Sequence, residues 1–372
     1  MKLLVLDQFS DPGGAQQQLL ELLPAIRDRR WRTLVGLPGE GELFERVRAL
    51  GFEAERIECG PYGSGRKSAA DMGRFLAGTP RLARQIRRMA QRVGASLVYL
   101  NGPRLLPAAA LAGLPCPVLF HTHSYVAAGM VRTVSGLALR HMNARVVAAC
   151  EFVAGPWRSF AGAERVSVIF NGVAGPFGAP RRPSDGPPRI GCIGRISPEK
   201  GQREFIAAAA QIHRSLPECR FTVYGSPLFG DATAERYAAE VRTAARELPV
   251  EWAGWVADVH GAMAELDLLL VPSVGVEATP RVILEAFAAG VPVIAFGSGG
   301  IPEVVENGVT GLLASSAEEM AQRAIVLLTG DPRRLISIAR AARARWQLSF
   351  TQEHYHAQLL RAIEAAAQRD SV

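Results

Sequence analysis

The stretch "ELDLLLVPSVGVEATPRVILEAFAAGVPVIAF", residues 265–296, contains two strand patterns separated by one helix pattern. The runs "LDLLLV" and "VPVIAF" are short and almost entirely apolar, which is typical of strands that are covered on both faces. Between them we expect a helix with Thr279 as its N-cap, Pro280 at its first position and Gly290 just beyond its end. A strand, a helix and a strand in this order predict a parallel sheet covered by helices.

The same alternation extends through the chain. Before residue 171, helix patterns follow the runs "KLLVLD", "TLVGL", "SLVYLN", "PVLFH" and "RVVAAC". Residues 171–188 then read as a linker, because nine of these 18 residues are Gly or Pro. The alternation restarts with "RIGCIG", "RFTVYG", "VEWAGWV", "LDLLLVPS", "VPVIAF" and "GLLA". The sequence therefore predicts two α/β halves joined by a hinge, with a ligand cleft between them.

Composition is consistent with this architecture and excludes several classes. The 372 residues exceed the usual size of one hydrophobic core. The net charge is +7, but only three of the 42 basic residues are lysines, so we attribute the basicity to arginine usage and expect no nucleic-acid partner. The five cysteines form no CxxC spacing, which argues against disulfides or a zinc site and favours a reducing cytoplasm. We expect neither a signal peptide nor a transmembrane segment.

Two glutamates flank the helix start in the opening stretch. The N–H groups of Arg281 and Val282 lie in the predicted first turn, where a helix favours an anion such as a diphosphate. A carboxylate beside that anion is suited to accept hydrogen bonds from hydroxyl groups attached to it, and Glu277 and Glu285 occupy such positions. In the alternative, Glu277 is a solvated loop residue and Glu285 pairs with Arg281, which contributes about 0.3–0.5 kcal/mol.

A second constellation is "RIGCIGRISPEKGQREFI", residues 189–206. The predicted strand ends before Arg195, and Lys200 follows five residues later. Two cations at the carboxyl end of a strand could bind the oxygens of a diphosphate leaving group, Arg195 through its planar fork and Lys200 as a point charge. The alternative is a pair of exposed loop cations.

Two signals lie in the first half. Gly13 and Gly14, in "DQFSDPGGAQQQLL", would let the backbone approach a ligand closely, although the stretch lacks the GxGxxG spacing of dinucleotide-binding proteins. His121 and His123 follow the strand pattern "PVLFH". No third ligand is nearby, so we predict no metal site. We expect His121 to line the cleft, with a structural buried histidine as the alternative.

In their order along the chain, these stretches resemble the retaining glycosyltransferases of family four, the group 1 type. The resemblance includes "GRISPEKG", the two glutamates and "AFAAGVPVIAFGSGGIPEVVENGVTGLL", and it covers nearly the whole chain. It implies an α/β fold of the GT-B type, in which two Rossmann-like domains have parallel sheets that face each other across a cleft. Residues 1–175 would bind the acceptor and residues 176–349 the nucleotide-sugar donor, with a helix within about 350–372 packing back on the first domain.

The resemblance also implies roles for individual residues. Arg195 and Lys200 would bind the donor diphosphate, Glu277 the hydroxyls of the donor sugar, and Glu285 the ribose. Gly14 would approach the phosphate or the acceptor, and His121 would line the reaction centre. The sequence departs from the family pattern at one place: Thr279 and Pro280 occupy the positions where the family usually has Phe and Gly.

The implied function is retaining, metal-independent transfer of a hexosyl or related group from a nucleotide-diphosphate sugar to an acceptor hydroxyl. The acceptor would be a sugar, a lipid-linked molecule or a small molecule, in cell-surface polysaccharide, glycolipid or glycoside biosynthesis, and no cofactor is expected. Two alternatives remain, a nucleotide-sugar epimerase of the same fold and a non-catalytic subunit that binds nucleotide sugars.

The helix pattern at residues 74–92 has Arg81, Arg84 and Arg88 along one side and apolar residues on another. Such a basic amphipathic helix suits an anionic membrane surface or a lipid-phosphate acceptor. It would place a cytoplasmic enzyme peripherally on the inner face of the membrane. The alternative is an ordinary surface helix in an arginine-rich protein.

Overall fold

A computed structural model describes residues 1–11, 13–39, 41–60, 69–179, 186–227 and 232–368. The chain divides into two compact units. Unit 1 comprises Met1–Phe170 with Tyr355–Val372, and unit 2 comprises Asn171–His354. This division lies slightly before the boundary expected at residues 175 and 176.

Unit 1 is built on a seven-stranded parallel sheet with the order β3-β2-β1-β4-β5-β6-β7. Its strands are β1 Lys2–Asp7, β2 Arg32–Leu37, β3 Glu53–Arg56, β4 Leu97–Asn101, β5 Val118–Thr122, β6 Arg145–Ala148 and β7 Val166–Val168. Its helices are α1 Gly14–Asp28, α2 Glu42–Ala49, α3 Ala69–Val93, α4 Leu106–Leu111, α5 Met130–His141 and α6 Glu151–Ala161, followed by most of α14 Gln352–Ala367.

Helices cover both faces of this sheet. Alternate residues of β1 point to opposite faces, so Leu3 and Val5 share a core with α1, α2 and α14. On the other face, a side chain added at Gly36 of β2 would meet Met89 of α3, and Phe120 of β5 contacts Trp157 of α6. The apolar runs of the central strands are buried on both sides for this reason.

The two edge strands, β3 and β7, were not recognised from the sequence. β3 has the polar sequence "EAER", and β7 has only three residues, one of them exposed. An edge strand needs less apolar surface because it has a single neighbour and is covered less completely. Neither strand therefore produces the apolar run on which the sequence interpretation depended.

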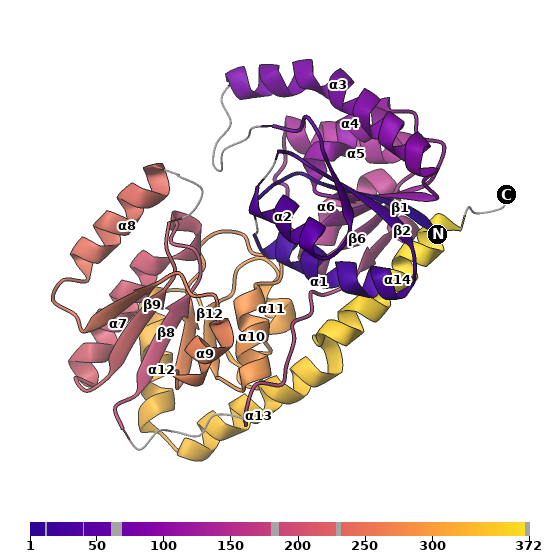
Figure 1. The fold of residues 1–372 in the computed structure, drawn as a ribbon. Coiled ribbons are helices and arrows are strands. Elements are labelled where there is room, and N and C mark those ends of the chain that lie inside the picture. The colour runs from indigo at the N-terminus through magenta and orange to yellow at the C-terminus, as the bar shows by residue number, and fades with distance from the viewer. Residues whose placement is uncertain (12, 40, 61–68, 180–185, 228–231, 369–372) are drawn as a thin grey trace. The chain divides into compact units, whose positions relative to one another are not determined.

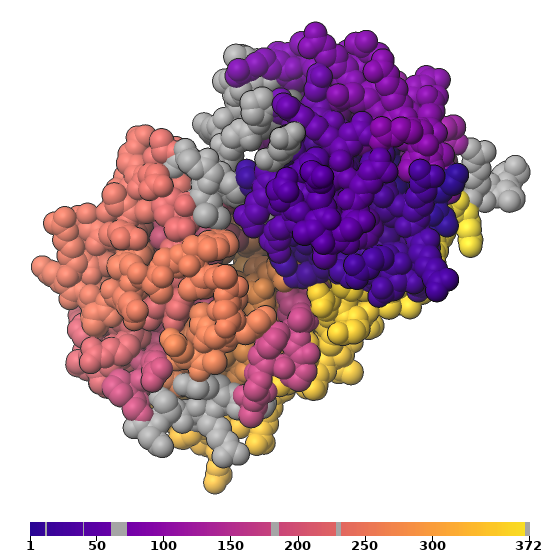
Figure 2. All heavy atoms as spheres, viewed as in Figure 1, coloured from indigo at the N-terminus to yellow at the C-terminus, as the bar shows by residue number. Residues whose placement is uncertain are grey.

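Most of the C-terminal helix α14 belongs to unit 1. Its residues Tyr355, Leu359 and Ile363 recur every four positions and are buried in the same core as Leu19 and Leu23 of α1. Figures 1 and 2 show this yellow segment beside the indigo N-terminal segment. The two ends of the described chain thus contribute to one core.

Unit 2 contains a six-stranded parallel sheet with the order β10-β9-β8-β11-β12-β13. Its strands are β8 Arg189–Ile193, β9 Arg220–Tyr224, β10 Val250–Gly254, β11 Leu268–Val271, β12 Val293–Phe296 and β13 Leu312–Ala314, and all six were predicted. Its helices are α7 Gln202–Ser215, α8 Ala232–Ala244, α9 Val259–Ala264, α10 Arg281–Ala289, α11 Ile301–Val304, α12 Ala317–Thr329 and α13 Pro332–Ser349.

The expected N-cap of α10 is wrong by one residue. Pro280 is the N-cap, in an extended conformation with ψ 118°, and the helix begins at Arg281. A proline disfavours the helical region for the residue before it, so Thr279 lies outside the helix. Thr279 is buried, and its carbonyl accepts a hydrogen bond of 3.4 Å from Asn171 Nδ2. The predicted end is confirmed, since Gly290 has the left-handed φ of 68°.

The Gly- and Pro-rich segment 171–188 is not entirely a free linker. Residues 180–185 lie outside the described residues, but Val173 forms an isolated β-bridge with Thr351. The indole N–H of Trp346 donates to the Val173 carbonyl at 3.3 Å. The first part of the segment is therefore fixed against the C-terminal helices of unit 2.

Candidate functional site

The two predicted cations and the first glutamate lie together at the carboxyl ends of the central strands of the unit 2 sheet. β8 and β11 are hydrogen-bonded neighbours, and the chain order reverses between them. Ligands of such sheets bind beyond the carboxyl ends of the strands at this reversal. Arg195 and Lys200 follow β8, and Glu277 lies in the loop after β11.

Each of the two cations is paired with a carboxylate. Lys200 Nζ donates to Glu277 Oε1 at 2.6 Å, across 77 residues of sequence. Arg195 donates to Glu199, four residues later in the same loop. Burial opposes ionisation of Glu199, but a backbone hydrogen bond and the Arg195 charge outweigh it and lower the pKa of that carboxyl.

Backbone contacts fix the loops that bear these side chains. Gly201 has φ 72°, and a Cβ there would lie 1.8 Å from the Pro272 carbonyl oxygen. Gly299, with φ 58°, is similarly close to the backbone of Glu277, since a Cβ would lie 2.1 Å from its carbonyl oxygen. The loops after β8, β11 and β12 therefore interlock, and Lys200 and Glu277 are positioned by that contact.

Gln202 also positions the loop after β8, a role that the sequence did not predict. Its fully buried side chain donates to the Arg195 carbonyl at 2.9 Å and accepts from the Ser197 amide at 3.3 Å. A buried glutamine in the first turn after a Gly could have been noticed, but sequence spacing does not reveal its partners. It shapes the turn that presents Arg195.

Glu285 forms the local ion pair with Arg281 that was the alternative interpretation of the sequence. Glu285 Oε1 lies 3.5 Å from Arg281 Nε, and both side chains are largely buried. Val282, from the same first turn of α10, lines a small cavity together with Lys200 and Pro280. The structure thus brings Val282 near Lys200, while the binding of a ribose by Glu285 stays a prediction.

A buried polar network lies at the corresponding reversal of the unit 1 sheet, between β1 and β4. Asp7 accepts hydrogen bonds from Asn101 Nδ2 and, at 2.9 Å, from Gln16 Nε2. The Asn101 oxygen lies 2.8 Å from His123 Nε2, which donates because an amide oxygen can only accept. Sequence reasoning assigned no role to Asp7 or Asn101, although both end apolar strand runs, which was an available signal.

His121 lies inside this network. Its ring is fully buried, its Nδ1 is hydrogen-bonded to the Tyr99 hydroxyl, and its centroid is 3.8 Å from that of His123. Burial and the neighbouring His123 lower the pKa of His121, so the ring is neutral near pH 7. Its buried Nε2 has no hydrogen-bond partner among the described residues.

The glycine pair lies at the start of α1. Gly13 is the N-cap in an extended conformation with φ −111°, and Gly14 is the first residue of the helix. A Cβ at Gly13 would lie 3.0 Å from Gln16 Oε1, so Gly13 is packed against the side chain that also binds Asp7. Approach of a ligand to Gly14 stays a prediction.

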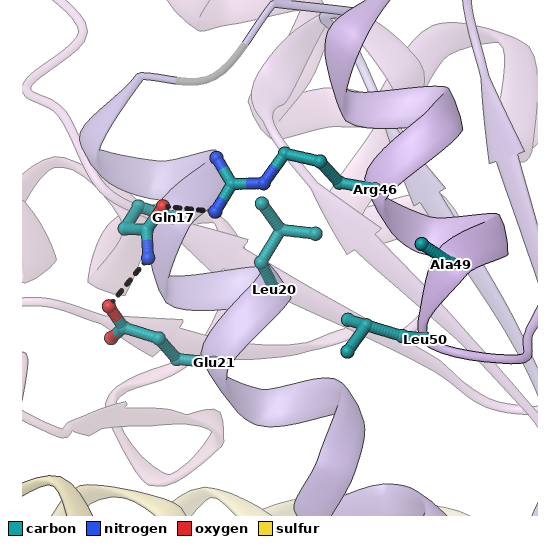
Figure 3. Close-up of a pocket in the computed structure, with 6 residues that line it drawn as sticks. All are labelled: Gln17, Leu20, Glu21, Arg46, Ala49 and Leu50. Atoms are coloured by element: carbon teal, nitrogen blue, oxygen red, sulfur yellow. Dashed lines mark hydrogen bonds between the residues drawn. The ribbon is translucent and has the colours of Figure 1, made fainter. Parts of the chain in front are cut away.

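A pocket that contains none of these side chains lies in a groove between α1 and α2. Its volume is about 310 Å³. It is lined by Gln17, Leu20, Glu21, Arg46, Ala49 and Leu50. Figure 3 shows that its polar groups bind one another: Arg46 donates to Gln17, and Gln17 donates to Glu21. It contains none of the predicted site residues, and we assign no ligand to it.

Both units have the Rossmann-like architecture of GT-B glycosyltransferases. Among solved structures, Alr3699/HepE from Anabaena in complex with UDP-glucose is 27% identical, with a TM-score of 0.81, and the match covers 98% of this chain and 100% of that one. Sucrose-phosphate synthase from Thermosynechococcus elongatus has the same fold, with a TM-score of 0.78, 20% identity and coverage of 98% and 100%. The predicted fold class is thereby confirmed.

Family models give the assignment at the level of sequence. The model for Glycosyltransferase Family 4 matches residues 12–174, and the model for Glycosyl transferases group 1 matches residues 187–330. The chain therefore belongs to the glycosyltransferases of family 4, as the resemblance indicated.

Curated relatives match part of the chain. A GDP-mannose-dependent alpha-(1-6)-phosphatidylinositol monomannoside mannosyltransferase of Mycolicibacterium smegmatis is 32% identical over 171 residues, which are 43% of each chain. The 2-deoxystreptamine glucosyltransferase of Streptomyces kanamyceticus is 33% identical over 165 residues, 43% of this chain and 41% of that one. These matches span less than half the length of the relatives.

The described residues contain no group of three or more His, Cys, Asp or Glu side chains arranged to bind a metal ion. Across the same part of the chain, no helix is both long and apolar enough to cross a bilayer.

The buried Asp7 predicts a pH-dependent stability. Burial raises the pKa of this carboxyl from 3.8 to about 6, against the opposing effect of hydrogen bonds from Asn101, Phe9 and Gln16. The folded state therefore binds the proton more tightly than the unfolded state. Stability from this group is fully present below about pH 4 and decreases as the pH rises to 6, by an amount on the order of 3 kcal/mol.

We expect the unfolding free energy of the wild type, relative to Asp7→Asn, to fall between pH 4.5 and pH 6.5. Urea denaturation at several pH values measures it, and the comparison removes titrations common to both proteins, such as that of His121. A difference that is constant or rises with pH would contradict the burial argument for Asp7.

Proposed function

We propose that the protein is a retaining glycosyltransferase that transfers a sugar from a nucleotide-diphosphate sugar to an acceptor hydroxyl. The observation that carries the proposal is the ion pair of Lys200 and Glu277, which lies where the strand order of the unit 2 sheet reverses. It pairs a cation suited to a phosphate with a carboxylate suited to sugar hydroxyls. Family membership supports the same reaction class.

In this proposal Arg195, Lys200 and the N-terminus of α10 bind the donor diphosphate. Negative charge develops on the departing phosphate during transfer, and fixed cations and helix amides stabilise it electrostatically. Thr279, Arg281 and Val282 belong to the segment that forms this helix start. A bound diphosphate would compete with Glu199 for Arg195 and with Glu277 for Lys200.

The carboxylates and unit 1 have complementary proposed roles. Glu277 accepts hydrogen bonds from the donor sugar, and Glu285 binds the ribose after exchange of its contact with Arg281. Gly13, Gly14 and His121 of unit 1 contribute to the reaction centre and to acceptor binding. The acceptor hydroxyl attacks from the face that the phosphate leaves, and the phosphate oxygen takes its proton, so that the reaction needs neither a metal nor an organic cofactor.

The names of similar proteins support the substrate class. The Anabaena protein was solved in complex with UDP-glucose, and the mycobacterial relative is named for GDP-mannose. We propose a nucleoside-diphosphate hexose as the donor and a sugar, lipid-linked or small-molecule alcohol as the acceptor, within polysaccharide, glycolipid or glycoside biosynthesis.

The test is nucleoside diphosphate release from a panel of UDP-, GDP- and ADP-sugars, with mono- and disaccharides, polyprenyl-phosphate sugars and phosphatidylinositol as acceptors. We expect turnover with one donor, undiminished by EDTA, and a product whose anomeric configuration by NMR equals that of the donor. Arg195→Ala and Glu277→Ala should each lower turnover about 100-fold or more, because each removes a group that contacts the reacting donor. The matched controls Arg214→Ala and Glu240→Ala change exposed helix residues of the same unit and should retain activity.

Other outcomes would contradict the proposal. Conversion of the donor into an epimer without nucleotide release indicates an epimerase. A donor that raises the melting temperature but never turns over with any acceptor indicates a binding subunit. Inverted product stereochemistry, or loss of activity in EDTA that added metal restores, would refute the retaining or metal-independent part.

A further inference from the structure

Residues 72–150 have an unusual charge composition. These 79 residues contain ten arginines and no aspartate, glutamate or lysine. Their formal charge therefore exceeds the +7 of the whole chain, and the rest of the protein is net acidic. The segment includes nearly all of α3, together with α4 and α5.

These three helices form one layer. α3 packs against α4, and α4 packs against α5, on the same face of the unit 1 sheet (Figure 1). α3 contacts β1 and β2, and the three helices contact one another in sequence, so the exposed residues of this layer lie away from the sheet. Neighbouring packed helices lie about 8–10 Å apart, so this outward side of α3, α4 and α5 is roughly 20 Å wide between the outer axes.

The outward side is apolar as well as basic. Of the 13 large apolar side chains that are exposed among the described residues, six lie on it and are between 40% and 69% exposed. They are Leu76, Leu111, Met130, Val131, Val134 and Leu137. Four of them follow one another on α5 at the spacing i, i+1, i+4 and i+7, which forms a single stripe.

Four arginines in the middle of α3 are available to an external partner. Arg81, Arg84, Arg87 and Arg88 are exposed, and within the part of the chain that the structure describes none of them forms an ion pair. Arg92, near the end of the helix, differs because it pairs with Glu53 and Glu55 of β3. Carboxylates thus neutralise one end of the helix and leave its middle positively charged.

We propose that the outward side of α3, α4 and α5 is a docking surface for an anionic lipid bilayer. The α5 stripe inserts its apolar side chains at the level of the headgroups, and the α3 arginines contact lipid phosphates. This arrangement combines the two contributions that fix peripheral proteins to membranes, apolar burial and attraction to anionic lipid. The surface contains none of the residues proposed to bind the donor, so the inference does not depend on the transferase reaction.

Charge complementarity favours a bilayer over a second copy of the chain. A self-association through this surface would bring two sets of unpaired arginines together without an acidic residue from either copy's segment 72–150. Like charges in contact disfavour such a dimer. An anionic bilayer supplies the opposite charge and an apolar layer at once.

The test is sedimentation with vesicles of phosphatidylglycerol and phosphatidylcholine in equal parts, and with phosphatidylcholine alone, at 50 mM and 300 mM NaCl. We expect the wild type to bind the anionic vesicles at low salt and to dissociate at high salt, because salt screens charges over a shorter distance. Each arginine near an anionic surface strengthens binding about fivefold, so Arg84→Gln with Arg88→Gln should weaken it about 25-fold. Met130→Ser with Leu137→Ser should weaken it at least 10-fold.

Matched controls come from unit 2. Arg236→Gln with Arg246→Gln removes the same charge from exposed positions, and Leu348→Ser removes an exposed apolar side chain. Both controls should bind vesicles as the wild type does, and circular dichroism should show all variants folded. Vesicles should also slow amide hydrogen exchange in α5.

Three results would overturn the proposal. The first is a wild type that does not bind the anionic vesicles at low salt or binds both vesicle types equally. The second is unchanged binding by both surface variants. The third is a wild-type dimer in size-exclusion chromatography that Met130→Ser with Leu137→Ser dissociates, without vesicle binding, which would assign the surface to self-association.

Discussion

Lys200→Ala is expected to lower turnover of the nucleotide-sugar donor by about 100- to 1,000-fold, the usual effect of removing one fixed group that stabilises developing charge. In addition, Glu277 loses the partner that lies 2.6 Å away. The carboxylate can then turn from its position or repel the donor phosphate. We therefore expect both the maximal rate and donor affinity to fall, measured as nucleoside diphosphate release and as donor-induced thermal stabilisation.

A second substitution separates these two causes. Glu277→Gln keeps an oxygen acceptor for sugar hydroxyls but removes the charge that pairs with Lys200. If Lys200 acts on the diphosphate directly, the double variant should be no more active than Lys200→Ala. The control Lys2→Ala, at an exposed lysine of unit 1, should be unaffected. Full activity of Lys200→Ala with the preferred donor would refute the proposed role.

Gly201→Ala is expected to damage both stability and activity. Gly201 has a left-handed φ of 72°, and the added Cβ would lie 1.8 Å from the Pro272 carbonyl oxygen. The conformation alone costs an alanine roughly 1–2 kcal/mol, and displacement of the β11 loop adds about 1–3 kcal/mol. Since Lys200 precedes Gly201 and Glu277 lies in the displaced loop, turnover should also fall at temperatures where the variant is folded.

Gly254→Ala is the matched control for the backbone conformation. Gly254 has nearly the same φ, 73°, but a Cβ there meets no atom within 4 Å. Urea denaturation should therefore show the smaller, conformational loss of about 1–2 kcal/mol for Gly254→Ala and a clearly larger loss for Gly201→Ala. Equal losses would mean that contact with Pro272 does not fix the loop.

The sequence predicted the elements whose physical cause is local. The central strands of both units are largely apolar runs because both faces of a parallel sheet are covered there. Gly290 ends α10 as predicted, because the left-handed conformation required there favours glycine. The edge strand β3 was not predicted, because its side chains lie largely outside the core and its sequence is therefore polar.

The arrangement of the candidate site depended on contacts between residues far apart in the sequence. No spacing rule joins Lys200 to Glu277, which are 77 residues apart, or Asp7 to Asn101, which are 94 apart. The order of strands within each sheet brings these pairs to the carboxyl ends of neighbouring strands. Buried backbone contacts such as that of Gly201 fix the orientation of the loops that bear them. The sequence alone determined the α/β class, the family resemblance and which charged residues follow strands. Tertiary structure alone decided their partners, because hydrogen bonds and burial depend on distances in space that local periodicity does not encode.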